Sequence, residues 1–405
     1  MAVEAVNTMP SPSLFARFVR LVSLGVVWLS GAMVLGFLVN LLERGGFSWI
    51  QGDWLINIEN IHVRRGPLGS LLIRISDATG VDLLLLLGAV QGGVMVLLLL
   101  ACTAVLWRLL RDPTFALIVF SPAVFFVFWM ANPRAIVRKE MLVFTALALL
   151  LLIPMRPALR WVLAGASLLL YLLAVSGHEA MTLMFPAWAA VLLVVMWPWR
   201  DRPLLWVMLG LGALAALAKG LYAIRFRGID DVMPVCAPLL ERGLGDSYCG
   251  GSIKWLIQGP VPVLERFGED VPVFLVGYVL ASIPLFWLAI RHPWRGPLLL
   301  GFFGLLVPVL PLYPIAWDWG RWMLMHGSAF ASLLMAAYLV HPRIAPRARL
   351  PARILSGLAI VGICAGNLFW APQWVHVGLN GGVAEQFREN VPRHVNRILR
   401  SLPGV

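Results

Sequence analysis

Four short polar segments interrupt an otherwise apolar chain, and they carry the side chains that could do chemistry. They are residues 53–65, 131–140 (ANPRAIVRKE), 178–179 and 316–326 (AWDWGRWMLMH). Arginines from separate segments can bind a phosphate or diphosphate bidentately, while a neighbouring carboxylate or histidine accepts a proton or holds an arginine in place. If the four segments meet, they are suited to bind a lipid diphosphate.

The candidate residues divide by chemistry. Glu179 and Asp53 are the candidate general bases, followed by His178. The arginines that could neutralise a departing diphosphate are Arg65, Arg134, Arg138 and Arg321. The other predicted substrate-binding residues are Glu59, Arg64, Lys139, Glu140, Asp318 and His326. No metal or other cofactor is expected, because arginines can supply the positive charge and the sequence offers no convincing carboxylate cage; a bound divalent ion is the alternative.

Simpler explanations exist for each of these residues. Juxtamembrane arginines often bind lipid head groups, Asp318 and Arg321 could form a local ion pair, and His178 with Glu179 could cap a helix. Arg134 and Arg138 are four residues apart, which predicts that they share a helical face. We favour one shared site because all four segments fall on the same side of the topology derived below.

The composition identifies the elements that must position these residues. Of 405 residues, 60% are hydrophobic and 13% charged, and the mean hydropathy is +0.85. A soluble domain is therefore excluded, and most of the chain is predicted to form membrane-spanning helices. The eleven expected spans are 19–41, 81–107, 114–130, 141–155, 161–176, 180–197, 203–222, 271–290, 297–316, 322–340 and 354–371.

The basic residues predict the orientation of this bundle. With the N-terminus inside, the cytoplasmic side carries 14 basic and three acidic residues, a net charge of +11. The other side carries the remaining 18 basic and 17 acidic residues, a net charge of +1. This asymmetry favours an N-in and C-out topology, and it explains the overall charge of +12 without a nucleic-acid partner.

The whole chain, 1–405, is expected to be one membrane domain with three longer outer segments. Residues 42–80 predict a short amphipathic helix on the membrane surface, and residues 372–405 predict a second interfacial helix. The loop 223–270 contains Cys236 and Cys249, which an oxidising compartment would join as a disulfide. Within the spans only scattered polar groups such as Gln91 occur, so an ion-coupled transporter is not favoured.

The chain resembles the membrane-integral C-type glycosyltransferases in the layout of its helices and loops. It also resembles the bacterial O-antigen and exopolysaccharide polymerases in the short motifs RRG, NPRAIVRKE, GHE and DWGR. The resemblance covers the acidic first loop with Asp53 and Glu59, and it extends over nearly the whole chain. It implies a multi-pass protein of the bacterial inner membrane, surrounded by lipids, that transfers sugar from a polyprenyl-(di)phosphate-linked saccharide. A lipid-linked saccharide flippase and a non-catalytic assembly subunit are the alternatives.

Overall fold

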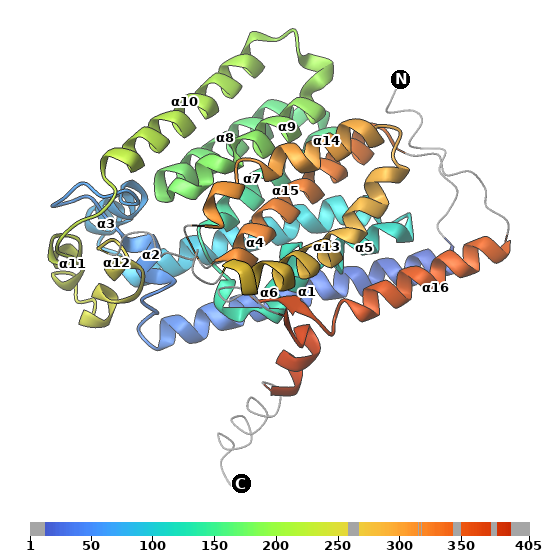
Figure 1. Ribbon diagram of the computed structural model, residues 1–405. Coiled ribbons are helices and arrows are strands. Elements are labelled where there is room, and N and C mark those ends of the chain that lie inside the picture. The colour runs from blue at the N-terminus through green and yellow to red at the C-terminus, as the bar shows by residue number, and fades with distance from the viewer. Residues whose placement is uncertain are drawn as a thin grey trace.

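The computed structural model is a bundle of helices and describes residues 13–257, 267–314, 316, 318–342, 350–373 and 379–389 (Figure 1). In these ranges the only strands are β1 (Ala371–Pro372) and β2 (Leu379–Asn380), which pair antiparallel. The all-α class expected from the composition is therefore confirmed. The longer helices are α1 (Leu14–Glu43), α3 (Pro67–Thr79), α4 (Leu83–Leu109), α7 (Glu140–Leu152), α8 (Arg160–Gly177), α9 (Phe185–Met196), α10 (Pro203–Arg225), α13 (Phe267–Arg291), α14 (Arg295–Leu306), α15 (Trp319–Val340) and α16 (Leu350–Gly366).

Short elements connect the long helices. The shorter α-helices are α2 (Gln51–Leu55), α5 (Ala116–Val119), α6 (Phe125–Ala131), α11 (Met233–Leu240) and α12 (Gly251–Lys254). The 3-10 helices are η2 (Pro113–Phe115), η3 (Pro133–Ala135), η4 (Ile153–Met155), η5 (Pro157–Leu159), η6 (Glu179–Met184), η7 (Trp197–Trp199), η8 (Asp246–Cys249) and η10 (Leu310–Leu312). Proline stands at the first or second position of most of the 3-10 helices, where its missing N–H has no helical partner to lose.

Eight helical segments in the described part of the chain are long and apolar enough to cross a membrane, which indicates a multi-pass membrane protein. They are Leu14–Glu43, Leu83–Leu109, Pro157–Gly177, Glu179–Trp199, Pro203–Arg225, Val271–Arg291, Arg295–Leu312 and Trp319–Val340. Glu140–Met155 and Ile354–Gly366 are apolar but shorter. The structure thus supports eight of the eleven expected spans by length and hydropathy.

The expected span 114–130 is divided into short pieces. The chain forms η2 and α5, turns near Pro122, and resumes as α6. All residues from Phe115 to Ala131 are buried. Apolar residues alone could not distinguish this segment from a lipid-facing helix, because protein interior and lipid are similarly apolar. It is part of the protein core.

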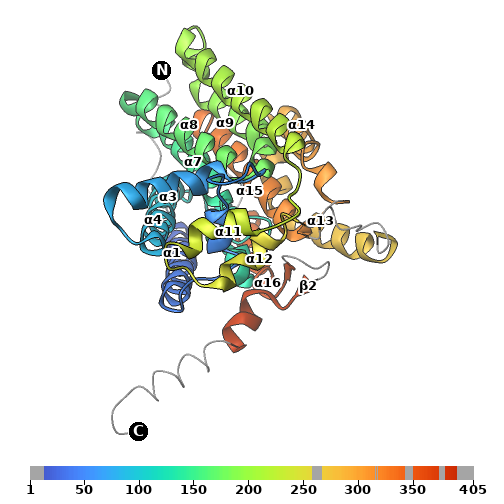
Figure 2. The same cartoon turned by 90° about the vertical axis from the view of Figure 1, so that its left-hand side faces the viewer.

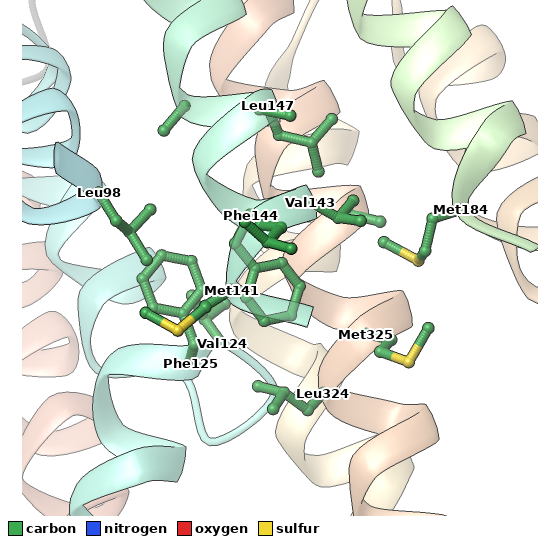
Figure 3. Packing of buried hydrophobic residues seen from close by; sticks show 14 of the residues in the cluster. Leu98, Val124, Phe125, Met141, Val143, Phe144, Leu147, Met184, Leu324 and Met325 are labelled. Carbon is green, nitrogen blue, oxygen red and sulfur yellow. The ribbon is translucent and has the colours of Figure 1, made fainter. Parts of the chain in front are cut away.

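The core lies around α7 and α15. In α15 every residue from Trp319 to Leu339 is buried, and α7 is buried almost throughout. Phe125 of α6 stacks on Phe144 of α7 with ring centroids 5.2 Å apart, and Met325 of α15 lies in the same apolar cluster (Figure 3). The two central helices carry charged residues at their first turns, so the core fixes where those charges lie.

One end of the bundle is covered by α2, α3 and the 226–257 loop, which contains α11 and α12 (Figures 1 and 2). Cys236 and Cys249 are disulfide-bonded with Cα atoms 5.5 Å apart, as the sequence predicts. The side-chain amide of Asn57 donates to the Val235 carbonyl at 2.8 Å and ties this loop to the α2–α3 connection. The disulfide therefore lies beside the segment that presents Asp53.

The expected interfacial helix at 42–80 corresponds to α3, which is amphipathic and has Gly80 in a left-handed C-cap at φ 70°. Gly69 lets α3 approach the chain closely, because a Cβ there would overlap the backbone of Ile56. Of the expected tail helix in 372–405, residues 382–389 are helical, whereas 390–405 lie outside the described residues.

Candidate active site

Asp53 is the central carboxylate of the candidate site. It lies in α2, has 1% exposure, and its oxygens are 3.7 Å from Arg65 Nη1 and 3.8 Å from Lys139 Nζ. Neither oxygen has a hydrogen-bond partner among the described residues. Burial by itself would raise the pKa of Asp53, but Lys139, Arg65, Arg138 and Arg321 outweigh it and hold the pKa below its ordinary value. The carboxylate is thus ionised at neutral pH and retains its hydrogen-bonding capacity.

Two consecutive arginines connect Asp53 to Glu179 and to the 226–257 loop. Arg65 binds Glu179 bidentately, with N–O distances of 2.8 to 3.0 Å. Arg64 lies 3.6 Å from the same carboxylate and donates to the carbonyls of Arg227 and Trp255 at 2.7 and 3.2 Å. Glu179 is therefore engaged in holding the two arginines.

Arg138 and Lys139 reach the site from a turn rather than from a helix. Ile136 is extended and Val137 has a left-handed φ of 49°, so the expectation that Arg134 and Arg138 share a helical face is wrong. The physical reason is that η3 ends at Ala135, and the extended Ile136 and the left-handed Val137 interrupt the helical path before α7 begins at Glu140. Arg138 and Lys139 are buried, whereas Arg134 is exposed.

Two buried lysines cap the carboxyl end of α8. Lys139 donates to the Gly177 carbonyl and Lys219 of α10 donates to the Ser176 carbonyl, each at 2.8 Å. Burial lowers the pKa of Lys139 to about 8, although Asp53 opposes the shift. Sequence reasoning missed Lys219. The sequence did contain a signal for it, because an ionisable residue inside an apolar helix is by itself grounds for the hypothesis of a functional site.

His178 follows α8 and faces the same carboxylates and cations. Its Nδ1 accepts a hydrogen bond from the Ala180 N–H at 3.0 Å and lies 3.5 Å from Glu179 Oε2. Burial, and then the positive charges of Arg65, Arg321 and two lysines, lower the pKa of His178 well below its usual value. In the neutral ring whose Nδ1 accepts, the proton is on Nε2, which has no hydrogen-bond partner among the described residues. His178 can therefore donate a hydrogen bond to a ligand.

The first turn of α15 completes the group. Arg321 pairs with Glu140 at the start of α7 and, through Nη1, with Asp318 Oδ2 at 3.1 Å. Asp318 is thus a local i,i+3 partner, as the simpler explanation predicts. In addition, the charge of Arg321 acts on Asp53, Arg65 and Arg138. Its salt bridges therefore belong to the same set of interacting charges.

We call this set the charged cluster. Its members are Asp53, Arg64, Arg65, Arg138, Lys139, Glu140, His178, Glu179, Lys219, Asp318 and Arg321. Six cations against four carboxylates leave a net charge of +2 with His178 neutral. The side chains of Arg65, Glu179 and Asp318 are 19%, 25% and 28% exposed, so part of the cluster is accessible from outside the protein.

Three predicted binding residues lie apart from the charged cluster. Glu59 pairs with Arg74 of α3 at 3.3 Å, because the α2–α3 connection directs it to the surface of α3. Arg134 is exposed in η3. His326 lies deeper along α15, where it hydrogen-bonds Tyr278 and the Phe302 carbonyl, because a position five residues after Arg321 is more than one helical turn away.

The donor set does not indicate a metal centre. In the described ranges no three His, Cys, Asp or Glu side chains lie together in a way that could hold a metal ion. Instead, arginines and lysines surround the carboxylates, an arrangement suited to a phosphate or another oxyanion. No family model, curated protein or solved structure matches the chain.

Proposed function

We propose that this protein is a membrane-embedded glycosyltransferase that takes sugar from a polyprenyl-phosphate-linked or polyprenyl-diphosphate-linked donor. The observation that carries the proposal is Asp53, an ionised and buried carboxylate with open hydrogen-bonding capacity, set among cations. Sugar transfer to a hydroxyl needs a base beside the acceptor and positive charge beside the departing phosphate. The charged cluster offers both within one group of side chains.

The cations are assigned to the donor phosphate. Arg65, Arg138, Lys139 and Arg321 supply charge around Asp53. The excess of two positive charges complements a lipid phosphodiester or diphosphate, and Arg65, Glu179 and Asp318 are partly exposed members of the cluster. When bonds to the anomeric carbon break, these cations stabilise the negative charge that develops on the leaving phosphate.

Asp53 is the better candidate for the base than Glu179 or His178. Glu179 is occupied by its bidentate pair with Arg65, and His178 presents an N–H rather than a free lone pair. A bound phosphate would compete with Asp53 for Lys139 and Arg65. The pKa of Asp53 would then rise in the complex, toward the range in which a base is most effective.

The proposal includes an orientation and a location. The N-terminus is placed inside and the charged cluster outside the cytoplasm, in the inner membrane of a bacterium, because the basic residues are concentrated in the short loops on the opposite side. The acceptor would be another lipid-linked or surface saccharide used in envelope polysaccharide or glycolipid assembly.

The test is product formation by purified protein in lipid nanodiscs, supplied with polyprenyl-phosphate-linked and polyprenyl-diphosphate-linked hexose donors and a saccharide acceptor. Asp53→Asn should retain donor binding and lower turnover by about two to four orders of magnitude. Glu59→Gln is the matched control, because Glu59 is an acidic residue of the same loop that pairs outside the cluster. Wild-type turnover in Asp53→Asn would refute the catalytic role.

The alternatives make different predictions in the same preparation. A lipid-linked saccharide flippase would move donor across proteoliposome membranes without forming product. A non-catalytic assembly subunit would do neither, and substitutions in the charged cluster would change only its abundance or its assembly with other proteins.

A further inference from the structure

The turn that presents Arg138 and Lys139 is held in an unfavourable backbone conformation. Val137 has a φ of +49° and is the only described non-glycine residue with positive φ. A β-branched side chain crowds the backbone in this region, so valine is a poor choice for it. Such residues persist where surrounding contacts over-determine the conformation, and they are concentrated at functional sites.

A buried hydrogen-bond network fixes the carbonyl of this residue. The Val137 oxygen accepts from Trp54 Nε1 at 2.9 Å and from Gln91 Nε2 at 3.1 Å. Gln91 Oε1 in turn accepts from Gln51 Nε2 at 3.2 Å, and Gln51 Oε1 accepts from the Phe47 N–H at 2.9 Å. The side chains of Gln51, Trp54 and Gln91 have 0% exposure, so water does not replace these bonds.

The network connects both charged partners of the candidate site. Gln51 and Trp54 flank Asp53 in the five-residue helix α2, and Val137 directly precedes Arg138 and Lys139. The same side chains therefore set the backbone that carries the carboxylate and the backbone that carries the two cations. Asp53 and Lys139, which these two segments carry, lie 3.8 Å apart.

We propose that Gln91, together with Trp54, is a positioning residue that holds Val137 in its left-handed conformation and so directs Arg138 and Lys139 toward Asp53. As a statement about catalysis this rests on the proposed function. As a statement about conformation it is independent of any substrate, and the two parts can be tested separately.

The conformational test is limited trypsin digestion in detergent, with the cut peptides quantified by mass spectrometry. Gln91→Met keeps the length of the side chain but removes its donor and acceptor. Cleavage after Arg138 and Lys139 should accelerate roughly fivefold, the change in an opening equilibrium that corresponds to one lost hydrogen bond. Cleavage after the exposed Arg134 serves as the internal reference, because it precedes the strained turn.

A glycine rescue separates positioning from general loss of structure. Glycine adopts positive φ without strain, so Val137→Gly should reduce the cleavage of Gln91→Met after Arg138. Ile136→Gly is the matched control, since Ile136 is equally buried but has an ordinary φ of −82°. Rescue by both glycines, or by neither, would overturn the proposal.

The catalytic test uses the sugar-transfer assay with the same variants. Gln91→Met and Trp54→Phe should lower kcat/KM by about ten- to 100-fold, the effect of misplacing catalytic groups by about 1 Å. Val137→Gly should restore most of the loss in the Gln91→Met background. Unchanged cleavage and unchanged turnover in Gln91→Met would overturn the inference. If wild-type protein forms no product, the proposed function fails, while the digestion still decides whether the network holds the turn.

Discussion

Replacing Asp53 and Lys139 singly and together tests whether the charged cluster is energetically one unit. Lys139 and Arg65 both lie within 4 Å of the Asp53 carboxylate. Asp53→Asn removes this negative charge and raises the net charge of the cluster from +2 to +3. Lys139→Gln retains a donor for the Gly177 carbonyl and lowers the charge to +1. The double substitution restores +2.

The magnitude follows from the geometry. Two unit charges 3.8 Å apart attract by about 4 kcal/mol at an effective dielectric constant of about 20. Removing one partner of a buried pair usually costs about 3 to 5 kcal/mol, whereas removing both costs much less. An unfolding entropy of about 2.1 cal/mol/K per residue gives about 1.2 °C per kcal/mol for 405 residues, so we expect Asp53→Asn to lower Tm by roughly 4 to 6 °C. The double variant should be more stable than Asp53→Asn.

Thermal unfolding in detergent, followed by tryptophan fluorescence at pH 7, measures these differences. A pH series adds a second check. Because the pKa of Lys139 is about 8 in the folded protein and 10.5 for the unperturbed side chain, the unfolded chain binds more protons between these values. The free energy of unfolding should therefore rise with pH across pH 8 to 10.5, by up to about 3 kcal/mol relative to Lys139→Gln.

Strict additivity would refute this reasoning. If the double variant loses as much Tm as the two single variants combined, Asp53 and Lys139 act independently and the cluster is not a coupled site. A stability difference between wild type and Lys139→Gln that does not change between pH 8 and 10.5 would show that Lys139 is not a desolvated ammonium group.

Three further predictions concern the surroundings of the site. Arg65→Lys should lower sugar-transfer kcat/KM at least tenfold, because an ammonium group cannot replace the bidentate pair with a carboxylate; activity close to wild type would contradict it. Gly69→Ala should lower the free energy of unfolding by about 1 to 3 kcal/mol, because the added Cβ would overlap the Ile56 backbone. Gly93→Ala is the control and should not destabilise the protein, because Gly93 has open space around it; equal Tm shifts in the two variants would contradict the prediction. Removing the disulfide by Cys236→Ser and Cys249→Ser should lower the free energy of unfolding by about 2 to 4 kcal/mol and speed proteolysis of the 226–257 loop, and an unchanged digestion pattern would count against it.

The grouping of polar segments was accessible from the sequence because membrane topology brings alternate connections to the same side. That argument anticipated the proximity of Asp53, Arg65, Lys139 and Glu179, which the structure places in one network of ion pairs. It could not assign partners. The bidentate pair of Arg65 with Glu179 depends on how α3 packs on α8, which residue types alone do not determine.

Other features depend on backbone conformation or tertiary packing. Arg134 and Arg138 have the spacing of a helical pair, but the left-handed Val137 places one outside and the other inside. Residues 114–130 have the hydropathy of a span, yet they are enclosed by other helices. Gln91 was visible as a scattered polar group, and only the structure connects it to Val137.

The nearly complete burial of α15 has a consequence for biogenesis. Arg321 and its partner Glu140 are 181 positions apart, and α15 packs against α7 and α9, which are inserted much earlier. Until the ribosome has released residues 319–340, the space that α15 fills is vacant and Glu140 lacks its arginine. Contacts so distant in sequence form late and leave partly assembled chains exposed. A nascent chain that ends before α15 is therefore an incomplete bundle in which Glu140 lacks the arginine that it pairs with in the complete protein, a form suited to recognition by membrane chaperones and quality-control proteases.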